Sequence, residues 1–335
     1  MPKANAIKDT DYLYASARVK SLEKNLLTRE RLERMSEARS PEDAVKLLSE
    51  SGWPEISNPT MAAVENVLSS RRSEAFALIR SLAPDKRLPD VFLIKYDYHN
   101  LKALLKGEAT GEAADGLEID SGRFSAHQLK MMLQEDSFSA MSKHMAESIA
   151  EARDVLARTQ DPQLLDIILD KAMYADMLEM AEALGSKFLQ GYVVLTVDSV
   201  NLRIAVRLRR MGKGPESLHY ALIPGGNVSV SRLSGDVTPD LIEAVFNTSP
   251  LAGAAQIGAK ALRGEASLSD VDMACDDALI KYLKGAKYVA FGAEPLIGYL
   301  AAVESELTSV RTVITGRLAG LAAELITERL RETYV

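Results

Sequence analysis

Apolar residues recur along most of this chain with the spacing of an amphipathic helix. In the C-terminal segment, roughly residues 304–332, they stand three to five positions apart with charged residues between them: Val310, Ile314, Leu318, Leu321, Leu325 and Leu330. An apolar stripe with this period covers one face of an α-helix. The β-branched run "YVVLTVDSV" sits inside a longer helical pattern, whereas "VSVSRL" follows the turn-like "PGGN". The pattern therefore predicts a helix for the first run, a loop for the second, and an all-α chain.

Three short helices are predicted from their capping residues. Ser40 precedes "PED", Ser125 precedes "AHQ" and Thr238 precedes "PDL". Such hydroxyl groups accept a hydrogen bond from a free N–H group of the first turn, and proline suits the first helical position. Two polar, glycine-containing stretches, residues 106–116 ("KGEATGEAADG") and 211–217 ("MGKGPES"), predict linkers.

A short motif recurs within the chain. The segment Asp97-x-x-Asn100-Leu101-Lys102 returns as Asp198-x-x-Asn201-Leu202-Arg203, and looser copies stand at Ser16-Ala17-Arg18 and Glu306-x-x-Ser309-Val310-Arg311. His99, beside Asp97, has no counterpart in the other copies. A pattern that repeats without its histidine favours architecture over catalysis. Each of the first three copies is followed by one of the three capped helices, which makes Ser40, Ser125 and Thr238 equivalent in this interpretation.

The copies lie about one hundred residues apart, which predicts three similar helical domains in residues 1–107, 108–212 and 213–335. No helix precedes the first copy and no capped helix follows the last, so one unit is divided between the termini. We therefore expect the C-terminal helix, 304–335, to pack against residues 1–107, so that the N- and C-terminal helices close a ring. An open solenoid would more often carry polar capping repeats at its ends.

The four motif copies end in a basic residue, and two interpretations of these bases stay open. Each base can pair with an acid or a helix C-terminus within the chain at a junction between units, or the bases can line a shared face or central opening that meets an acidic partner. Together with the two motif asparagines they are the candidate junction or interface residues: Arg18, Asn100, Lys102, Asn201, Arg203 and Arg311.

Composition narrows the class of protein. The 335 residues are 47% hydrophobic and 26% charged, as in an ordinary folded domain, and the net charge of −7 argues against a general nucleic-acid binder. One cysteine excludes an internal disulfide. The first residues lack the apolar core of a signal peptide, and no apolar run approaches the length of a membrane span, so we expect neither.

No catalytic, cofactor-binding or metal-binding residue is expected. The segment "GAAQIGAK" has no lysine directly after its second glycine, as a phosphate loop requires. Cys275 stands next to Asp276 and Asp277, whose charges disfavour a thiolate, so we expect a buried structural thiol. The remaining histidines lack the spacing of metal ligands: His127, His144 and His219. An enzyme that uses the acid pair at 276 and 277 is the weakest alternative.

Four segments carry a resemblance to a known family. The segments "YLYASARVKSLEKNLL", "YDYHNLKALLKG", "VDSVNLRIAVR" and "RERLRETYV" resemble the C subunit of prokaryotic V/A-type rotary ATPases, which is similar to the d subunit of the eukaryotic V-type enzyme. The resemblance covers essentially the whole chain. The sequence departs from the family pattern at Ser16 and Ser309, where the family often has asparagine.

The resemblance implies a funnel of three similar all-α domains in a pseudo-threefold arrangement. It implies a non-catalytic rotor protein on the cytoplasmic face of the membrane, one copy per complex, between the central shaft subunits and the membrane proteolipid ring. Such a protein couples ion transport to ATP hydrolysis or synthesis. The resemblance implies no catalytic residue and no cofactor. The alternative is an α-helical scaffold for other partners.

Overall fold

The computed structural model describes residues 7–111 and 117–335, and within these ranges it contains helices and no strand. The all-α prediction is therefore confirmed. The chain forms two compact units, Met1–Pro89 with Asp276–Val335 (unit 1) and Asp90–Cys275 (unit 2). The division into three similar domains remains a prediction. In the described part of the chain, no helix combines the length and the hydropathy needed to cross a bilayer.

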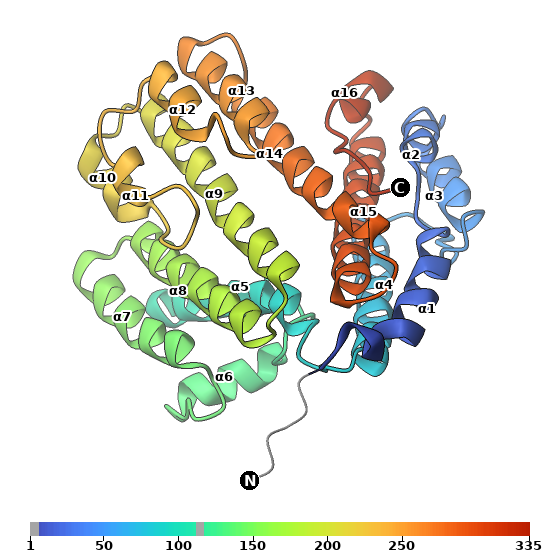
Figure 1. The fold of residues 1–335 in the computed structure, drawn as a ribbon, viewed down its shortest axis with the longest axis horizontal. Coiled ribbons are helices and arrows are strands. Elements are labelled where there is room, and N and C mark those ends of the chain that lie inside the picture. Colours follow the sequence, from blue (N-terminus) through green and yellow to red (C-terminus); the bar gives the residue numbers. More distant parts are fainter. Residues whose placement is uncertain (1–6, 112–116) are drawn as a thin grey trace. The chain divides into compact units, whose positions relative to one another are not determined.

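Unit 1 combines the first and last segments of the chain (Figure 1). Its helices are η1 (Asp9–Tyr12), α1 (Leu13–Glu23), α2 (Arg29–Ser36), α3 (Pro41–Ser49), α4 (Met61–Leu82), η2 (Lys284–Tyr288), α15 (Ala293–Leu318) and α16 (Ala323–Thr327). The long helix α15 packs against α1, α2, α3 and α4, so the C-terminal helix is the centre of this unit. Most of α15 is buried, including Leu300, Val303 and Leu307.

Unit 2 is a stack of helices contributed by one continuous stretch of chain. Its helices are α5 (Asp90–Thr110), α6 (Ala126–Gln134), α7 (Lys143–Thr159), α8 (Pro162–Ala183), α9 (Lys187–Arg210), α10 (Pro215–Ala221), α11 (Val230–Leu233), α12 (Pro239–Phe246), α13 (Ala252–Arg263) and the first half of α14 (Leu268–Leu283). Helix α8 packs against α5, α7 and α9, and α9 also packs against α13. The run "YVVLTVDSV" lies inside α9, as predicted.

The predicted caps are confirmed and several predicted boundaries are wrong. Ser40, Ser125 and Thr238 each accept a hydrogen bond from the N–H group three residues later. The loop predicted for "VSVSRL" contains the short helix α11. The predicted linker 106–116 begins inside α5, and its residues 112–116 lie outside the described ranges. In the second predicted linker, α10 already begins at Pro215.

The C-terminal helix differs most from the prediction of one helix over 304–332. Helix α15 begins eleven residues earlier and ends at Leu318. Gly320 then adopts φ +69°, the left-handed conformation that closes many helices. The N–H of Leu321 donates to the carbonyl of Gly316 at 2.9 Å, which turns the chain back toward α15. The apolar period continues across this turn because α16 uses the same apolar surface, with Ile326 buried.

We predict that Gly320→Ala lowers the free energy of unfolding by about 1 kcal/mol, because the left-handed conformation that glycine adopts freely is unfavourable for an L-residue. Gly320→Asn is the matched control, since asparagine tolerates this conformation better than alanine. Urea unfolding of both variants measures the difference. Equal stability of the alanine variant and the wild type would show that the turn at Gly320 does not require left-handed backbone.

Candidate functional site: side-chain clamps on the long helices

The recurring motif is a buried clamp, which we define as a polar side chain on a long helix that binds the backbone of a loop. In α5 the two motif residues Asp97 and Asn100 lie three positions apart, so both point to the same side of the helix. Both are fully buried. Asn100 donates from Nδ2 to the carbonyl of Ile119 at 2.9 Å and accepts its N–H at 2.8 Å. One amide side chain thus satisfies both backbone groups of one loop residue.

Asp97 binds the same loop a few residues further on. Its Oδ1 accepts the N–H groups of Arg123 and Phe124 at 2.8 and 3.1 Å, and its Oδ2 accepts Nε of Arg123 at 2.6 Å. The loop therefore ends in a fixed position directly before the capping residue Ser125 of α6. Asp97 and His99 form no catalytic pair, since His99 is exposed and its Nε2 lies 2.9 Å from the carbonyl oxygen of Leu117.

Helix α9 repeats the arrangement. Asn201 donates to the carbonyl of Ile223 at 2.7 Å and accepts its N–H at 2.8 Å. Asp198 accepts the N–H groups of Asn227 and Val228 at 3.1 and 3.0 Å. In both loops the first N–H bound by the aspartate comes four residues after the isoleucine (123 − 119 and 227 − 223). The two copies in unit 2 are therefore equivalent in geometry as well as in sequence.

A glycine makes each of these two clamps possible. A Cβ atom on Gly122 would lie 2.1 Å from Oδ1 of Asp97, and one on Gly226 would lie 2.1 Å from Oδ1 of Asp198. Each loop therefore has the form Ile-x-x-Gly, followed by the two N–H groups that the aspartate binds. This half of the motif was not predicted from the sequence. The signal was present in "IDSGRF" and "IPGGNV".

Unit 1 contains two reduced clamps. Ser16 on α1 donates to the carbonyl of Gly292 at 3.2 Å and accepts its N–H at 3.3 Å, which reproduces the paired bonds of Asn100 and Asn201. Glu306 on α15 accepts the N–H of Leu27 at 2.6 Å, directly before the capping residue Thr28 of α2. Ser309 instead donates to the carbonyl of Ser305 in its own helix. Each junction in unit 1 thus keeps one member of the motif.

The helices that follow the clamped loops identify the equivalent caps. Ser125 caps α6, as predicted. The corresponding positions after the other loops are Thr28, whose hydroxyl caps α2, and Ser229, which precedes α11 but forms no side-chain capping bond. The predicted equivalence of Ser125 with Ser40 and Thr238 is therefore wrong. Ser40 and Thr238 do cap helices, but these are the next helices along the chain, α3 and α12. Cap chemistry alone does not distinguish neighbouring short helices.

Three of the four motif bases form ion pairs within the chain. Lys102 lies 2.6 Å from Asp170 on α8, and Arg311 binds both carboxylate oxygens of Glu65 on α4. Arg203 donates to the carbonyl of Asp272 at 3.1 Å, and its Nε lies 3.6 Å from the carboxylate of that residue. Arg18 is exposed on α1 and forms no ion pair with the residues that the structure describes. The interpretation that the base pairs within the chain therefore fits Lys102, Arg203 and Arg311.

Burial sets the electrostatics of the clamps. Burial raises the pKa of Asp97, although the guanidinium of Arg123 and two N–H groups oppose this effect. Burial also raises the pKa of Asp198, which has two N–H donors. Burial raises the pKa of Glu306 to about 7, opposed by the N–H of Leu27 and the charge of Arg71. The clamp acids are structural groups whose charge is costly in the places that they occupy.

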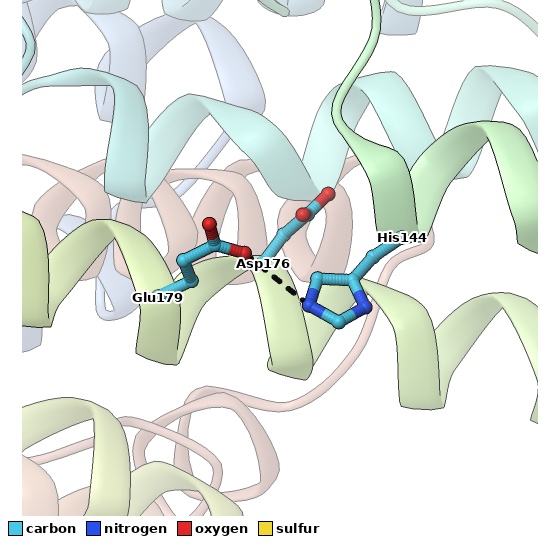
Figure 2. A group of neighbouring side chains, drawn as sticks. All are labelled: His144, Asp176 and Glu179. Atoms are coloured by element: carbon cyan, nitrogen blue, oxygen red, sulfur yellow. Dashed lines mark ion pairs between the residues drawn. The ribbon is translucent and has the colours of Figure 1, made fainter.

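One group of potential metal ligands comes together in unit 2. His144 on α7 faces Asp176 and Glu179 on α8, with their ligand atoms within 4.8 Å of one another (Figure 2). Nε2 of His144 lies 3.3 Å from Glu179. Oδ2 of Asp176 already accepts the hydroxyl groups of Tyr98 and Ser142 at 2.7 and 2.6 Å. The buried acid thus ties α5 and the start of α7 to α8, which explains its position without a metal. Spacing within one helix could not reveal this group, since its members lie on two helices.

The other segments with candidate chemistry also have structural explanations. The segment "GAAQIGAK" lies within helix α13 rather than in a phosphate-binding loop. Asp276 accepts Nε of Arg331 at 2.8 Å, and Asp277 accepts the N–H of Glu332 at 2.7 Å, so the acid pair holds the C-terminal segment in place. Cys275 is fully buried.

We predict that Gly226→Ala lowers the free energy of unfolding by roughly 1–3 kcal/mol, because the new methyl group displaces Asp198 and leaves buried N–H groups without an acceptor. Gly235→Ala in the same unit is the control, since a Cβ there meets no atom within 4 Å. Chemical denaturation of both variants tests this. A Gly226→Ala protein as stable as the Gly235→Ala protein would contradict a tight clamp.

Comparison with known proteins identifies the family of this chain. Residues 15–329 match the family described as ATP synthase (C/AC39) subunit. The chain is 23% identical to the C subunit of a V-type sodium ATPase from Enterococcus hirae, over 94% of this chain and 97% of the relative. It is 24% identical to the C subunit of an A-type ATP synthase from Methanocaldococcus jannaschii (94% and 85%) and 25% identical to that from Thermococcus kodakarensis (97% and 92%). The chain therefore belongs to the ATP synthase (C/AC39) subunit family of rotary ATPases.

Proposed function

We propose that this chain is the non-catalytic rotor protein that couples the central shaft of a V/A-type ATPase to the membrane proteolipid ring, on the cytoplasmic face of the membrane. The match to the family along 15–329 is the observation that carries this proposal. One copy per complex then transmits rotation during ion transport coupled to ATP hydrolysis or synthesis. We also propose that three similar helical domains form the funnel expected for this family.

The clamps support a mechanical role. A protein that transmits torque must resist deformation, and closely packed helices form a dense body of low compressibility. Packing alone leaves the loops between helices free to move. In this chain the loops before α2, α6, α11 and α15 are bound by buried side chains of α15, α5, α9 and α1. These bonds limit bending at the points where a helical body is otherwise softest.

The acidic residues with candidate chemistry are bound in structural contacts. Asp97 and Asp198 bind loop backbone, and Asp276 and Asp277 bind the C-terminal segment. A general acid or base needs a carboxyl group within reach of a substrate. The geometry therefore supports a coupling role over an enzyme that uses the acid pair at 276 and 277.

The proposal predicts that the shaft and the ring separate when this chain is absent. Complexes purified through a tagged shaft subunit, with and without this chain, provide the test. We expect the proteolipid ring to co-purify only when the chain is present, and purified chain added back to restore the link. Retention of the ring without the chain would contradict the coupling role.

The exposed face of α1 is the surface that we propose for partner contact. Leu13 and Tyr14 are 52% and 74% exposed there, next to Arg18. The neighbouring segment adds Tyr288, which is 91% exposed. The two segments are joined by Lys20, whose Nζ donates to the carbonyl of Lys287 at 2.8 Å. Exposed apolar and aromatic side chains beside an exposed arginine are typical of a protein interface.

We predict that Arg18→Glu weakens binding of the shaft about three- to tenfold at low salt and less at high salt, since charges at an interface rim are screened. The melting temperature should stay unchanged, because Arg18 is exposed. Arg203→Glu is expected to lower the melting temperature instead, because it breaks the contact with Asp272. Arg158→Glu on α7 is the control for charge reversal at an exposed site. Unchanged shaft affinity of Arg18→Glu at low salt would exclude Arg18 from the interface and leave the coupling role intact.

A further inference from the structure

Glu306 is a buried acid with only one hydrogen bond. It lies on α15 in unit 1 and is 6% exposed. Its Oε1 accepts the N–H of Leu27 at 2.6 Å, which joins the loop between α1 and α2 to the C-terminal helix. Its Oε2 is buried and has no hydrogen-bond partner among the residues that the structure describes. A buried carboxylate oxygen without a donor is costly, whereas a protonated oxygen carries no charge and can itself donate.

A small cavity lies beside this carboxyl group. Its volume is about 10 Å³, which is room for about one water molecule. Leu27, Ser309, Thr333 and Tyr334 line it together with Glu306. The cavity is therefore bordered by the loop before α2, by α15 and by the C-terminal segment. A hydroxyl group on Oε2 has space there for one water-sized acceptor.

The equivalent acids in unit 2 are better compensated. Asp97 has the guanidinium of Arg123 and two backbone N–H groups. Asp198 has two backbone N–H groups. Glu306 has one. The number of donors that stabilise a negative charge at this position of the repeat therefore falls from Asp97 to Asp198 to Glu306. It is lowest at Glu306, where the two ends of the chain meet.

The charged groups around Glu306 do not replace the missing donors. On α4, Arg71 stacks on the Trp53 ring at 5.4 Å, and Arg72 binds Glu304 at 2.8 Å. On α2, Arg29 binds Glu33 and the carbonyls of Thr327, Leu330 and Arg331. From the C-terminal segment, Tyr334 donates to Glu23 of α1. Val335 of the C-terminal segment also lines the cavity. Tyr299 of α15 is a further titratable neighbour, and burial raises its pKa, so it stays neutral near pH 7. Arg71 acts on Glu306 only through its charge.

We propose that Glu306 is a proton-binding latch. In the closed junction the neutral carboxylic acid accepts the N–H of Leu27 and places its own hydroxyl group toward the cavity. Loss of the proton to solvent leaves a buried carboxylate with one donor, and the junction then opens so that water can hydrate the charge. The latch ties the loop between α1 and α2 to α15, and its strength follows the pH of the surrounding solution.

The direction of the pH dependence follows from linkage. The pKa of Glu306 is about 7 in the folded protein against an ordinary value of 4.5, so the closed junction binds the proton more tightly than the open one. The stabilisation is fully present below pH 4.5 and is lost as the pH rises through about 7. Across that window the opening equilibrium rises by about two and a half orders of magnitude, one power of ten for each unit of the difference between about 7 and 4.5.

Amide hydrogen exchange of the full-length chain tests the latch. The N–H of Leu27 reports opening directly, because it is the group bound to Glu306. After correction for the intrinsic exchange rate, we expect its opening equilibrium to rise by more than about tenfold between pH 5 and pH 8. Glu306→Gln should remove this dependence, because an amide keeps the shape and the acceptor but cannot ionise. Glu324→Gln, at an exposed position of α16, should behave as the wild type.

A second measurement uses only the wild-type chain, so it does not depend on whether the Glu306→Gln variant folds. The carboxyl carbon of Glu306, followed by ¹³C NMR in the wild-type chain, should titrate well above the range of the exposed glutamates. A midpoint in the ordinary range of an exposed glutamate would overturn the proposal. So would corrected exchange of Leu27 that does not change with pH, or the same pH dependence in Glu306→Gln. None of these outcomes bears on whether the chain couples shaft and ring.

Discussion

The architecture depends on how buried loop backbone is satisfied. A loop that packs against a helix cannot use the helix's own backbone groups, which are already paired, and its covered N–H and C=O groups have little access to water. Here the long helices provide acceptors from their side chains instead. Asp97, Asp198 and Glu306 accept loop N–H groups, and Asn100, Asn201 and Ser16 bind both groups of one residue. Each loop consequently has one path over the helix, and the next helix begins from a fixed position.

Polar clamps give the fold a specificity that apolar packing cannot give. Apolar packing alone specifies a structure less strictly, because one apolar side chain of similar volume can replace another at modest cost. A buried aspartate that loses two N–H donors has no substitute, and the cost of an unsatisfied buried group is roughly 1–3 kcal/mol. The clamps therefore fix the register between long helices and the loops that follow them. In the coupling role that we propose, this fixed register allows a force on one helix to move its neighbours.

The sequence predicted the local features of the fold well but not the hydrogen-bond partners of the motif residues. The helical period, the caps Ser40, Ser125 and Thr238 and the structural role of the motif followed from short-range patterns. The hydrogen-bond partners of the motif residues could not be predicted in this way, because Asp97 binds a residue 26 positions away and Ser16 binds one 276 positions away. The end of α15 was missed because the apolar period continues across Gly320 into α16. The group at His144 was missed because its members come from two helices.

The two clamps in unit 1 differ from those in unit 2 because of where the helix and the loop of each clamp lie along the chain. In unit 2, helix and loop belong to one continuous segment, so a single helix can carry both the amide and the acid that bind the loop. In unit 1 each clamp joins opposite ends of the chain and keeps one member of the motif. Ser16 on α1 binds the loop before α15, and Glu306 on α15 binds the loop before α2. The reduced clamp of Glu306 offers the acid one N–H group instead of two. The junction that joins the termini thus depends on whether its acid carries a proton, while the junctions of unit 2 retain their donors when their acids are charged.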